Sequence, residues 1–217
     1  MPLPQPRRIL VVGAGGHARV CLEALCDSYE TTIVGCLTRD DDGTSTHGCD
    51  VVGSDHQLED LFQALGATHA FIAIGNNHSR AAFVNRCATT GIPLAVATSR
   101  GAIMSRSATV GDGVLLAPGS VVNAAARLGA GVIVNTNASV DHDCVVGECA
   151  HIAPGVAIGG SVSIGSEVLV GIGARIISGI SVGDGATIGA GTVVVRDVPA
   201  GAVVVGSPAR RLERSPR

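Results

Sequence analysis

Residues 110–140 read VGDGVLLAPGSVVNAAARLGAGVIVNTNASV, and every sixth residue of this stretch is aliphatic. The pattern continues without a break to residue 194, at Val110, Leu116, Val122, Leu128, Val134, Val140, Val146, Ile152, Ile158, Ile164, Val170, Ile176, Val182, Ile188 and Val194. A period of six fits neither the 3.6-residue turn of a helix nor the two-residue alternation of a strand. It is typical of hexapeptide repeats, so it predicts an all-β parallel β-helix in the second half of the chain.

Two further columns support the solenoid. The position two residues before each aliphatic residue is small or β-branched throughout, from Ala108 to Thr192. Three hexads make one coil, so stacked positions are 18 residues apart, and at that spacing one corner is always glycine: Gly111, Gly129, Gly147, Gly165 and Gly183. We expect this corner to turn with positive φ, because only glycine adopts such angles without steric cost.

The hexads occupy only the second half of the 217 residues, so two domains are expected. The first half alternates strand-like runs, at 9–12, 31–37 and 70–74, with helix-like segments, and this favours a small Rossmann-like α/β domain with a parallel sheet. Residues 95–98 are expected to form the last strand of that sheet. The predicted division is 1–102 for the α/β domain and 103–217 for the β-helix, with a C-terminal cap after residue 194.

Composition excludes several classes of protein. A net charge of −3 leaves no electrostatic footprint for nucleic acid, and no apolar run is long enough to span a membrane. The seven cysteines are odd in number and scattered, so we expect reduced thiols and a cytoplasmic protein. Cys144 and Cys149 lie on expected solenoid faces and are interpreted as small buried hydrophobes, so no metal site is predicted.

Gly13-Ala14-Gly15-Gly16-His17 follows the first expected strand and precedes the first expected helix. Free backbone N–H groups at such a place can hold a phosphate. Three interpretations stay open: an NAD site with Ala18 in place of the third glycine, a tight turn without ligand, and a site for another nucleotide. The last is favoured because Gly75-Asn76-Asn77 also follows a strand of the same sheet.

His142 lies between two carboxylates in Val140-Asp141-His142-Asp143-Cys144. It is either a solvated surface residue or a general base whose basicity the carboxylates raise. Eighteen residues further on is Gly160, about 4.8 Å away in the next coil. A backbone N–H there, unobstructed by a side chain, would place an oxyanion donor beside the imidazole.

His151 is the second histidine of the solenoid, half a coil from His142. The two need not meet within one chain, but in an oligomer they could approach each other from different chains. Two histidines are too few for the three-ligand zinc site of a γ-type carbonic anhydrase. A thiol nucleophile is equally disfavoured, because Cys144 is expected to point inward. The flat, Val-rich faces of such a solenoid favour a cyclic oligomer.

Four stretches in a fixed order, together with the solenoid, are typical of one family: Gly13-Ala14-Gly15-Gly16-His17, Ile72-Ala73-Ile74-Gly75-Asn76-Asn77, residues 135–154 with His142-Asp143-Cys144, and Gly206-Ser207-Pro208-Ala209. The chain resembles the sialic acid O-acetyltransferase and nucleotide amino-sugar N-acetyltransferase family over nearly its whole length. The resemblance implies a left-handed β-helix and a homotrimer with active sites at subunit interfaces. The Asp-His-Asp-Cys context is similar to perosamine N-acetyltransferases, which implies a role in lipopolysaccharide O-antigen biosynthesis.

The resemblance also implies roles for individual residues. His142 would be the general base, Asp143 would hold its other ring nitrogen, and the Gly160 N–H would bind the thioester oxygen. Acetyl-CoA would contact His151, Gly160, Ile172, Gly173 and Ala190, and the nucleotide sugar would contact Gly15, Gly16, His17, Thr38, Arg39, Gly75 and Asn76.

The sequence is therefore interpreted as an acetyl-CoA-dependent N-acetyltransferase, without a metal, that acts on the 4-amino group of a nucleotide-linked 4-amino-4,6-dideoxy sugar. GDP-perosamine is the favoured substrate, because Thr38-Arg39 before Asp40 departs from the adjacent acidic residues of UDP-using members. The alternatives are a UDP-4-amino-sugar N-acetyltransferase, a sialic acid or glycan O-acetyltransferase, and a non-catalytic scaffold that binds a nucleotide sugar.

Overall fold

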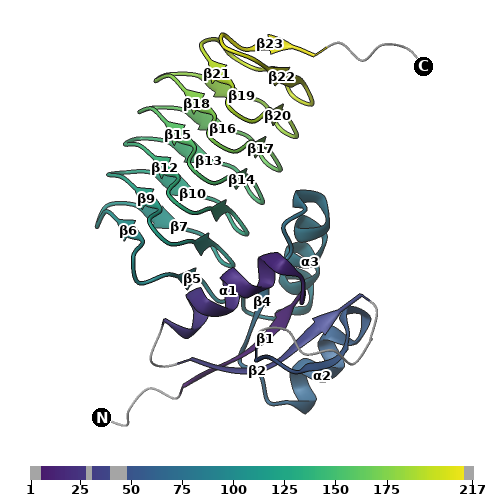
Figure 1. Ribbon diagram of the computed structural model, residues 1–217. Helices are drawn as coiled ribbons and strands as arrows, with labels where there is room; N and C mark the ends of the chain where they lie inside the picture. Colours follow the sequence, from purple (N-terminus) through teal and green to yellow (C-terminus); the bar gives the residue numbers. More distant parts are fainter. Residues whose placement is uncertain (1–5, 28–30, 40–47, 213–217) are drawn as a thin grey trace, which may run out of the picture.

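The computed structural model describes residues 6–27, 31–39 and 48–212. A small α/β domain lies at one end of a long triangular solenoid (Figure 1). The solenoid coils stack away from the α/β domain, and the chain ends at the far end of the stack (Figure 1). The two expected architectures are therefore both present.

The α/β domain contains one parallel sheet with the strand order β3-β2-β1-β4. Its strands are β1 (Arg7–Val12), β2 (Thr31–Thr38), β3 (Val51–Ser54) and β4 (His69–Ile72). Its helices are α1 (Gly16–Cys26), η1 (Asp55–Gln57), α2 (Leu58–Ala64) and α3 (Asn77–Thr90). The sequence predicts all of these except β3 and η1, which are too short to show a period.

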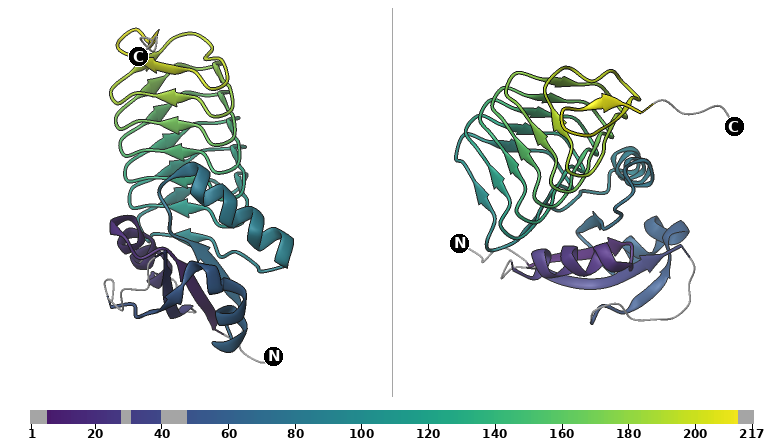
Figure 2. Two further views of the ribbon diagram at one scale, coloured as in Figure 1. Left: turned by 90° about the vertical axis from the view of Figure 1, so that its right-hand side faces the viewer. Right: turned by 45° about the horizontal axis from the view of Figure 1, so that its top comes forward.

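The two faces of the sheet pack against different partners. Ile9 and Val11 of β1 are buried with α1 and with solenoid residues such as Leu115. Leu10 and Val12 point the other way and are buried with residues of α2 and α3. This strict alternation places α1 between the sheet and the solenoid, as the two views of Figure 2 show.

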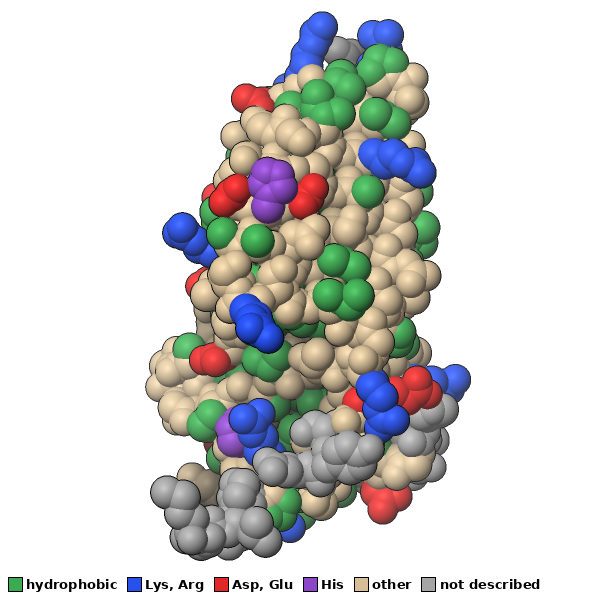
Figure 3. Space-filling view, turned by 90° about the vertical axis from the view of Figure 1, so that its left-hand side faces the viewer, with side chains coloured by type: hydrophobic (Ala, Val, Ile, Leu, Met, Phe, Trp, Pro, Cys, Tyr) green, Lys and Arg blue, Asp and Glu red, His purple; other side chains and the backbone are tan. Residues whose placement is uncertain are grey.

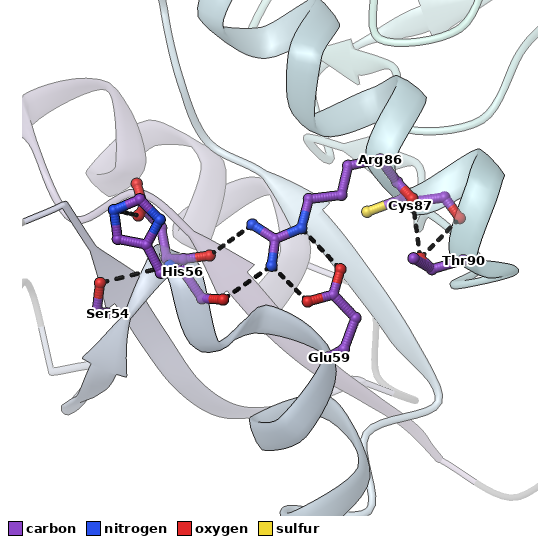
Figure 4. Close-up of polar contacts among 7 residues, drawn as sticks. Ser54, His56, Glu59, Arg86, Cys87 and Thr90 are labelled. Carbon is purple, nitrogen blue, oxygen red and sulfur yellow. Dashed lines mark hydrogen bonds and ion pairs between the residues drawn. The ribbon is translucent and has the colours of Figure 1, made fainter.

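Arg86 connects α3 to η1 and α2 within the α/β domain (Figure 4). Its Nε donates to Glu59 Oε1 at 2.7 Å, and its Nη2 donates to Glu59 Oε2. Its remaining donors reach the backbone carbonyls of Asp55 at 3.0 Å and His56 at 2.9 Å. A bidentate pair of this kind fixes orientation as well as distance.

The solenoid is built from two-residue strands that form three parallel sheets. Each strand pairs with the strand 18 residues further along the chain, so Ser139 pairs with Ala157 and Val140 with Ile158. The strands are β5 (Ala97–Thr98), β6 (Ile103–Met104), β7 (Thr109–Val110), β8 (Leu115–Leu116), β9 (Val121–Val122), β10 (Arg127–Leu128), β11 (Ile133–Val134), β12 (Ser139–Val140), β13 (Val145–Val146), β14 (His151–Ile152), β15 (Ala157–Ile158), β16 (Ser163–Ile164), β17 (Leu169–Val170), β18 (Arg175–Ile176), β19 (Ser181–Val182), β20 (Thr187–Ile188), β21 (Val193–Val194), β22 (Val203–Val205) and β23 (Arg210–Arg211).

The side chains of the aliphatic column, and of the column two residues before it, point into the solenoid. Their members are buried over almost the whole length of the stack and form one continuous hydrophobic core. Ser120 and Thr192, the polar members of the second column, are also fully buried. The predicted 18-residue coil is therefore confirmed in register as well as in period.

The predicted reason for the glycine column is wrong. None of its five members has a positive φ. A Cβ on Gly147 would instead lie 2.5 Å from the Ser166 backbone N and 2.6 Å from the Gly165 carbonyl carbon. Glycine is therefore required because the next coil passes too close for a side chain. The left-handed residues of this corner lie two positions further on: Gly113, Gly131, Cys149, Glu167 and Gly185.

The prediction that residues 95–98 form the last strand of the α/β sheet is wrong. β5 pairs with β8 and so belongs to the solenoid, because it continues the 18-residue register backwards from Leu115. Only a single bridge, between Ala70 and Leu94, connects this region to the α/β sheet. The domain division after residue 102 stays a prediction. At the other end, β22 and the antiparallel β23 leave the six-residue register and cover the last coil, as expected for a cap.

The prediction that all cysteines are reduced is wrong for one pair. Cys36 and Cys49 form a disulfide with their Cα atoms 6.2 Å apart, because the pairing of β2 with β3 brings the two ends of the intervening loop together. The other five cysteines are free thiols, and Cys144 and Cys149 are buried as expected. No helix among the described residues is both long and apolar enough to cross a membrane.

Candidate active site

A cavity of about 570 Å³ opens at the carboxyl edge of the α/β sheet. Four of the predicted nucleotide-sugar residues line it: Gly15, Thr38, Arg39 and Asn76. The remaining lining residues are Gly13, Ala14, Leu37, Asp55, Ile74, Ser79 and Phe83. Open α/β sheets bind ligands at this edge, between strands whose helices leave in different directions.

Local backbone geometry explains the glycine loop above this cavity. Gly13 has a φ of +112°, and a Cβ there would lie 2.7 Å from the Ala73 carbonyl oxygen. Gly15 and Gly16 have open space where a side chain would stand. The N-termini of α1 and α3 both begin here, and Asn76 caps α3 by accepting a hydrogen bond from Ser79 N at 2.9 Å. Two helix N-termini beside one cavity favour a ligand that carries phosphate.

Three predicted sugar-binding residues lie beside this cavity but do not line it. Gly16 is exposed at the start of α1. His17 turns toward Gly75, with its ring within 4 Å of the place where a Gly75 Cβ would be. The His17 ring also approaches that of His151, with centroids 6.2 Å apart. His17 and Gly75 therefore lie against the solenoid. Residues 40–47, which continue the expected Thr38 loop, lie outside the described residues.

His151 connects the solenoid to the α/β domain. Asn135 Nδ2 donates to His151 Nε2 at 3.1 Å, and Asn135 Oδ1 accepts from Thr136 N at 2.8 Å, which fixes the orientation of the amide. The ring also hydrogen-bonds to the backbone of Gly75. These contacts hold the His151 ring where the solenoid meets the α/β domain.

The two facing imidazoles are held in the neutral form. Burial, with the positive charge of Arg80 as a second cause, lowers the pKa of His17 to about 4. The same two causes lower the pKa of His151 to about 4. The Nε2 atom of His17 is buried and has no hydrogen-bond partner among the described residues. Near neutral pH neither ring carries charge, so both can only accept or donate as neutral imidazoles.

His142 lies on an exposed corner between β12 and β13. Its Nδ1 is 2.8 Å from Asp143 Oδ2. Asp141 Oδ1 accepts from the His142 backbone N at 2.7 Å and from Asn123 Nδ2 at 3.0 Å, which fixes the turn. The hydrogen bond to Asp143 raises the pKa of His142, and the charge of Asp141 adds to the effect. The imidazole is therefore oriented through one nitrogen while the other is free for a substrate.

Gly160 lies one coil beyond His142, as the 18-residue spacing predicts. A Cβ on Gly160 would be 2.5 Å from His142 Nε2, so any side chain there would displace the ring. The neighbouring Ser161 N donates to the His142 carbonyl at 2.8 Å, whereas the Gly160 N–H has no backbone or side-chain acceptor among the described residues. An unpaired N–H donor beside an oriented imidazole is an arrangement that can serve acyl transfer.

The predicted acetyl-CoA residues lie on successive coils at one corner, where Ile172 and Gly173 follow β17 and Ala190 follows β20. Ile172 leaves 62% of its surface exposed, and Gly173 turns with a φ of +67°. This corner carries an apolar exposed side chain on a rigid frame. No group of three or more His, Cys, Asp or Glu side chains in the described part of the chain is arranged to hold a metal.

The cavity and His142 lie on different sides of one chain. The α/β domain packs on the sheet that contains β5, β8 and β11, whose residues Ala97, Leu115 and Ile133 join its core. His142 belongs to the opposite corner, where the other two sheets meet. On the side of the molecule away from α3, Figure 3 shows a histidine flanked by acidic side chains on the solenoid surface.

The sequence gives no sign of the role of Arg80, which connects the domains, or of Asp55, Ser79 and Phe83, which line the cavity. Arg80 is only one turn into α3 and is 1% exposed. A lone arginine in an expected helix is ordinarily a surface residue, so its sequence position carries no signal. Asp55 comes from η1, which the sequence does not predict.

Comparisons with known proteins agree with this geometry. The family model for the PglD N-terminal domain matches residues 8–87. A histidine-to-alanine variant of GDP-perosamine N-acetyltransferase from Caulobacter crescentus, solved with CoA and GDP-perosamine, is 36% identical, with 95% of this chain and 97% of that chain covered and a TM-score of 0.89. The acetyltransferase domain of PglB from Neisseria gonorrhoeae is 37% identical, with 95% and 100% covered and a TM-score of 0.91. WeeI from Acinetobacter baumannii is 28% identical, with 95% and 100% covered and a TM-score of 0.85.

The α/β domain followed by a left-handed parallel β-helix defines an acyltransferase of the hexapeptide-repeat class. Within that class, the chain belongs to the family of acetyl-CoA-dependent sugar N-acetyltransferases that includes the Caulobacter and Neisseria proteins. The fold class and the family that the sequence predicts are both confirmed.

Proposed function

We propose that this chain transfers the acetyl group of acetyl-CoA to the 4-amino group of GDP-perosamine, a nucleotide-linked 4-amino-4,6-dideoxy sugar, as a step toward O-antigen lipopolysaccharide. The observation that carries the proposal is the His142–Asp143 pair beside the unpaired N–H of Gly160. The Caulobacter relative supports the acceptor, because it was crystallised with CoA and GDP-perosamine together.

The proposed reaction is a direct transfer in a ternary complex. The sugar amine attacks the thioester carbonyl carbon while His142 Nε2 takes its proton, and Asp143 stabilises the resulting imidazolium through Nδ1. The Gly160 N–H donates to the carbonyl oxygen as negative charge develops there, an effect worth roughly 3 kcal/mol for one donor. The C–S bond then breaks, and the thiolate of CoA takes the proton from His142.

The cavity in the α/β domain is the proposed nucleotide-sugar site. The helix N-termini beside Gly15 and Asn76 would hold the diphosphate, and Thr38 and Arg39 lie at the rim where the nucleoside would enter. Gly16, His17 and Gly75 lie next to this site, on its solenoid side. An arginine at the end of β2, rather than a carboxylate, supports guanine over uracil.

We further propose that the active site is completed by a second copy of the chain in a homotrimer. One chain holds its nucleotide cavity and His142 on opposite sides, so a sugar amine bound in that cavity needs the His142 of a neighbouring subunit. Acetyl-CoA would lie at the same interface, along Ile172, Gly173 and Ala190. His151, which lies where the solenoid meets the α/β domain, would face it with its neutral ring.

The test of the proposed function is thiol release from acetyl-CoA against GDP-perosamine, UDP-4-amino-4,6-dideoxy sugars and CMP-sialic acid. Turnover confined to GDP-perosamine is the expected result. Turnover with a UDP-linked amino sugar alone would correct the nucleotide but keep the reaction. Turnover with CMP-sialic acid alone would make the protein an O-acetyltransferase, and binding without thiol release would make it a scaffold.

A second prediction tests the base. His142→Ala should lower kcat by about 10²-fold or more, in the range of general-base contributions. Acetyl-CoA affinity, measured by calorimetry, should stay within about threefold, since only the proton acceptor is lost. Activity that survives within a few-fold would show that the amine arrives already deprotonated.

A further inference from the structure

Arg80 is a buried cation without a carboxylate partner in hydrogen-bond contact among the described residues. It comes from the first turn of α3 and is 1% exposed. Burial is the main cause that lowers the pKa of Arg80. Burying an unpaired charge costs several kcal/mol, so a fold that keeps it there must satisfy its donors in another way.

All three guanidinium nitrogens donate to groups of the protein, and these groups belong to both domains. In the loop before α3, Nη1 reaches the carbonyl oxygens of Ile74 at 2.9 Å and Gly75 at 3.1 Å, and Nη2 reaches Asn77 Oδ1 at 2.8 Å. In the solenoid, Nε donates to the Gly131 carbonyl at 2.7 Å and Nη2 to the Cys149 carbonyl at 2.7 Å. The two solenoid carbonyls are 18 residues apart, so the guanidinium lies across two consecutive coils.

The loop that Arg80 holds is part of the nucleotide cavity, because Ile74 and Asn76 line it. Two more side chains fasten the same loop to the solenoid: Asn77 Nδ2 donates to the Glu167 and Val168 carbonyls at 2.9 and 3.1 Å, and His151 hydrogen-bonds to Gly75. Acyl transfer requires the bound sugar to stand at a fixed distance from groups on the solenoid. A planar fork that joins both domains provides such a fixed distance.

We propose that Arg80 is a positioning residue that fixes the sugar-binding loop Ile74–Asn77 on the solenoid, so that the nucleotide sugar is presented to the acetyl group at a constant place. This inference rests on the proposed function for its kinetic consequence, but not for its structural one. A lysine cannot replace Arg80, because one ammonium has three donors at a single point and cannot span the carbonyls of both domains.

The test compares Arg80→Lys and Arg80→Met with Arg8→Met. Arg8 is a matched control, since its guanidinium also donates to two backbone carbonyls, those of Gly66 and Leu65, but at the opposite end of β1 from the cavity. Two readouts are used on the full-length protein: hydrogen–deuterium exchange of residues 73–79, and steady-state kinetics with each substrate varied in turn.

For Arg80→Lys we expect exchange of residues 73–79 to quicken by about tenfold or more and kcat/KM for the nucleotide sugar to fall by about tenfold or more, through a lower kcat as well as a higher KM, with the KM for acetyl-CoA within about threefold. Arg8→Met should change neither readout. Unchanged exchange in Arg80→Lys, or an equal rise in both KM values, would overturn the inference. If Arg80→Met does not fold, the exchange and kinetic measurements on Arg80→Lys still test the inference. If the wild-type protein acetylates no amino sugar, the proposed function fails, while the exchange measurement still tests Arg80.

Discussion

At the scale of single residues, the proposed role of His142 as general base predicts how activity depends on pH. The hydrogen bond that the His142 ring donates to the Asp143 carboxylate raises the pKa of His142 above its ordinary value of 6.5, so the imidazole stays protonated to a higher pH than a free histidine. A general base works only when unprotonated, so kcat/KM should fall as the pH drops through this raised pKa. Asp143→Asn removes the charge and tolerates the left-handed backbone at this position, where φ is +59°.

The expected result for Asp143→Asn is an acid limb displaced to lower pH, together with a lower plateau because the imidazolium is less stabilised. The measurement is kcat/KM against pH from 5 to 9. Glu148→Gln is the matched control, since Glu148 is an exposed carboxylate of the same coil at another corner. An acid limb that stays in place in Asp143→Asn would assign it to a group other than His142.

Functional residues can be predicted from sequence where the interacting side chains are adjacent in the chain. The Asp141-His142-Asp143 turn can be recognised in the sequence itself, and its position next to Gly160 follows from the 18-residue coil. Arg80 is different, because its partners are backbone carbonyls at residues 131 and 149, which leave no mark in the sequence. Its importance follows only from packing between domains.

At the scale of elements, the glycine column is a steric requirement of the stacked coils. Gly147→Ala should lower the free energy of unfolding by about 3 kcal/mol, since its Cβ would overlap the backbone of the next coil and cannot move away. Gly155→Ala is the control. Gly155 has a φ of +68° but nothing within 4 Å of its Cβ position. Gly155→Ala should therefore lower the free energy of unfolding by about 1–2 kcal/mol.

Chemical denaturation of both variants compares crowding with backbone strain directly. Ala125 already occupies a left-handed position with a φ of +59°, which shows that this fold accepts alanine there. If Gly155→Ala lowers the free energy of unfolding more than Gly147→Ala does, backbone strain at positive φ is the main reason for glycine at the corners, and the crowding explanation is contradicted.

Elements were predictable in proportion to their regularity. The two-residue strands of the solenoid are too short to predict singly, yet fifteen repeats of one spacing fix their register. β3 was missed because four residues, Val51–Ser54, show no period and its pairing with β2 depends on the chain returning across a loop. β5 was placed in the wrong sheet because it precedes the regular hexads, although it lies 18 residues before β8.

At the scale of the whole molecule, one chain holds its cavity and His142 on different sides, so the proposed mechanism needs a second subunit. Composition and periodicity predict the two domains, and the glycine-rich loops that follow strands of the α/β sheet predict a ligand site there. The side of the solenoid that faces that cavity is set by how α1 and α3 pack on it, through contacts such as Leu115 against α1 and Arg80 against Gly131. This packing turns the cavity away from the corner that carries His142, and it makes the partner subunit part of the proposed mechanism.

Subunit complementation tests this arrangement. His142→Ala removes the base and leaves the cavity intact, whereas Gly15→Glu places a negative charge in the cavity where Gly15 has a φ of −80° and free space around it. The two chains are co-expressed with different tags, and mixed trimers are isolated with both. In a cyclic trimer every mixed composition contains one interface that combines an intact cavity with an intact base, so about one third of wild-type activity should return.

Each variant alone should be inactive. Mixed trimers as inactive as either parent would show that cavity and base act within one chain, and the opposite-sides argument would then require a movement between the α/β domain and the solenoid.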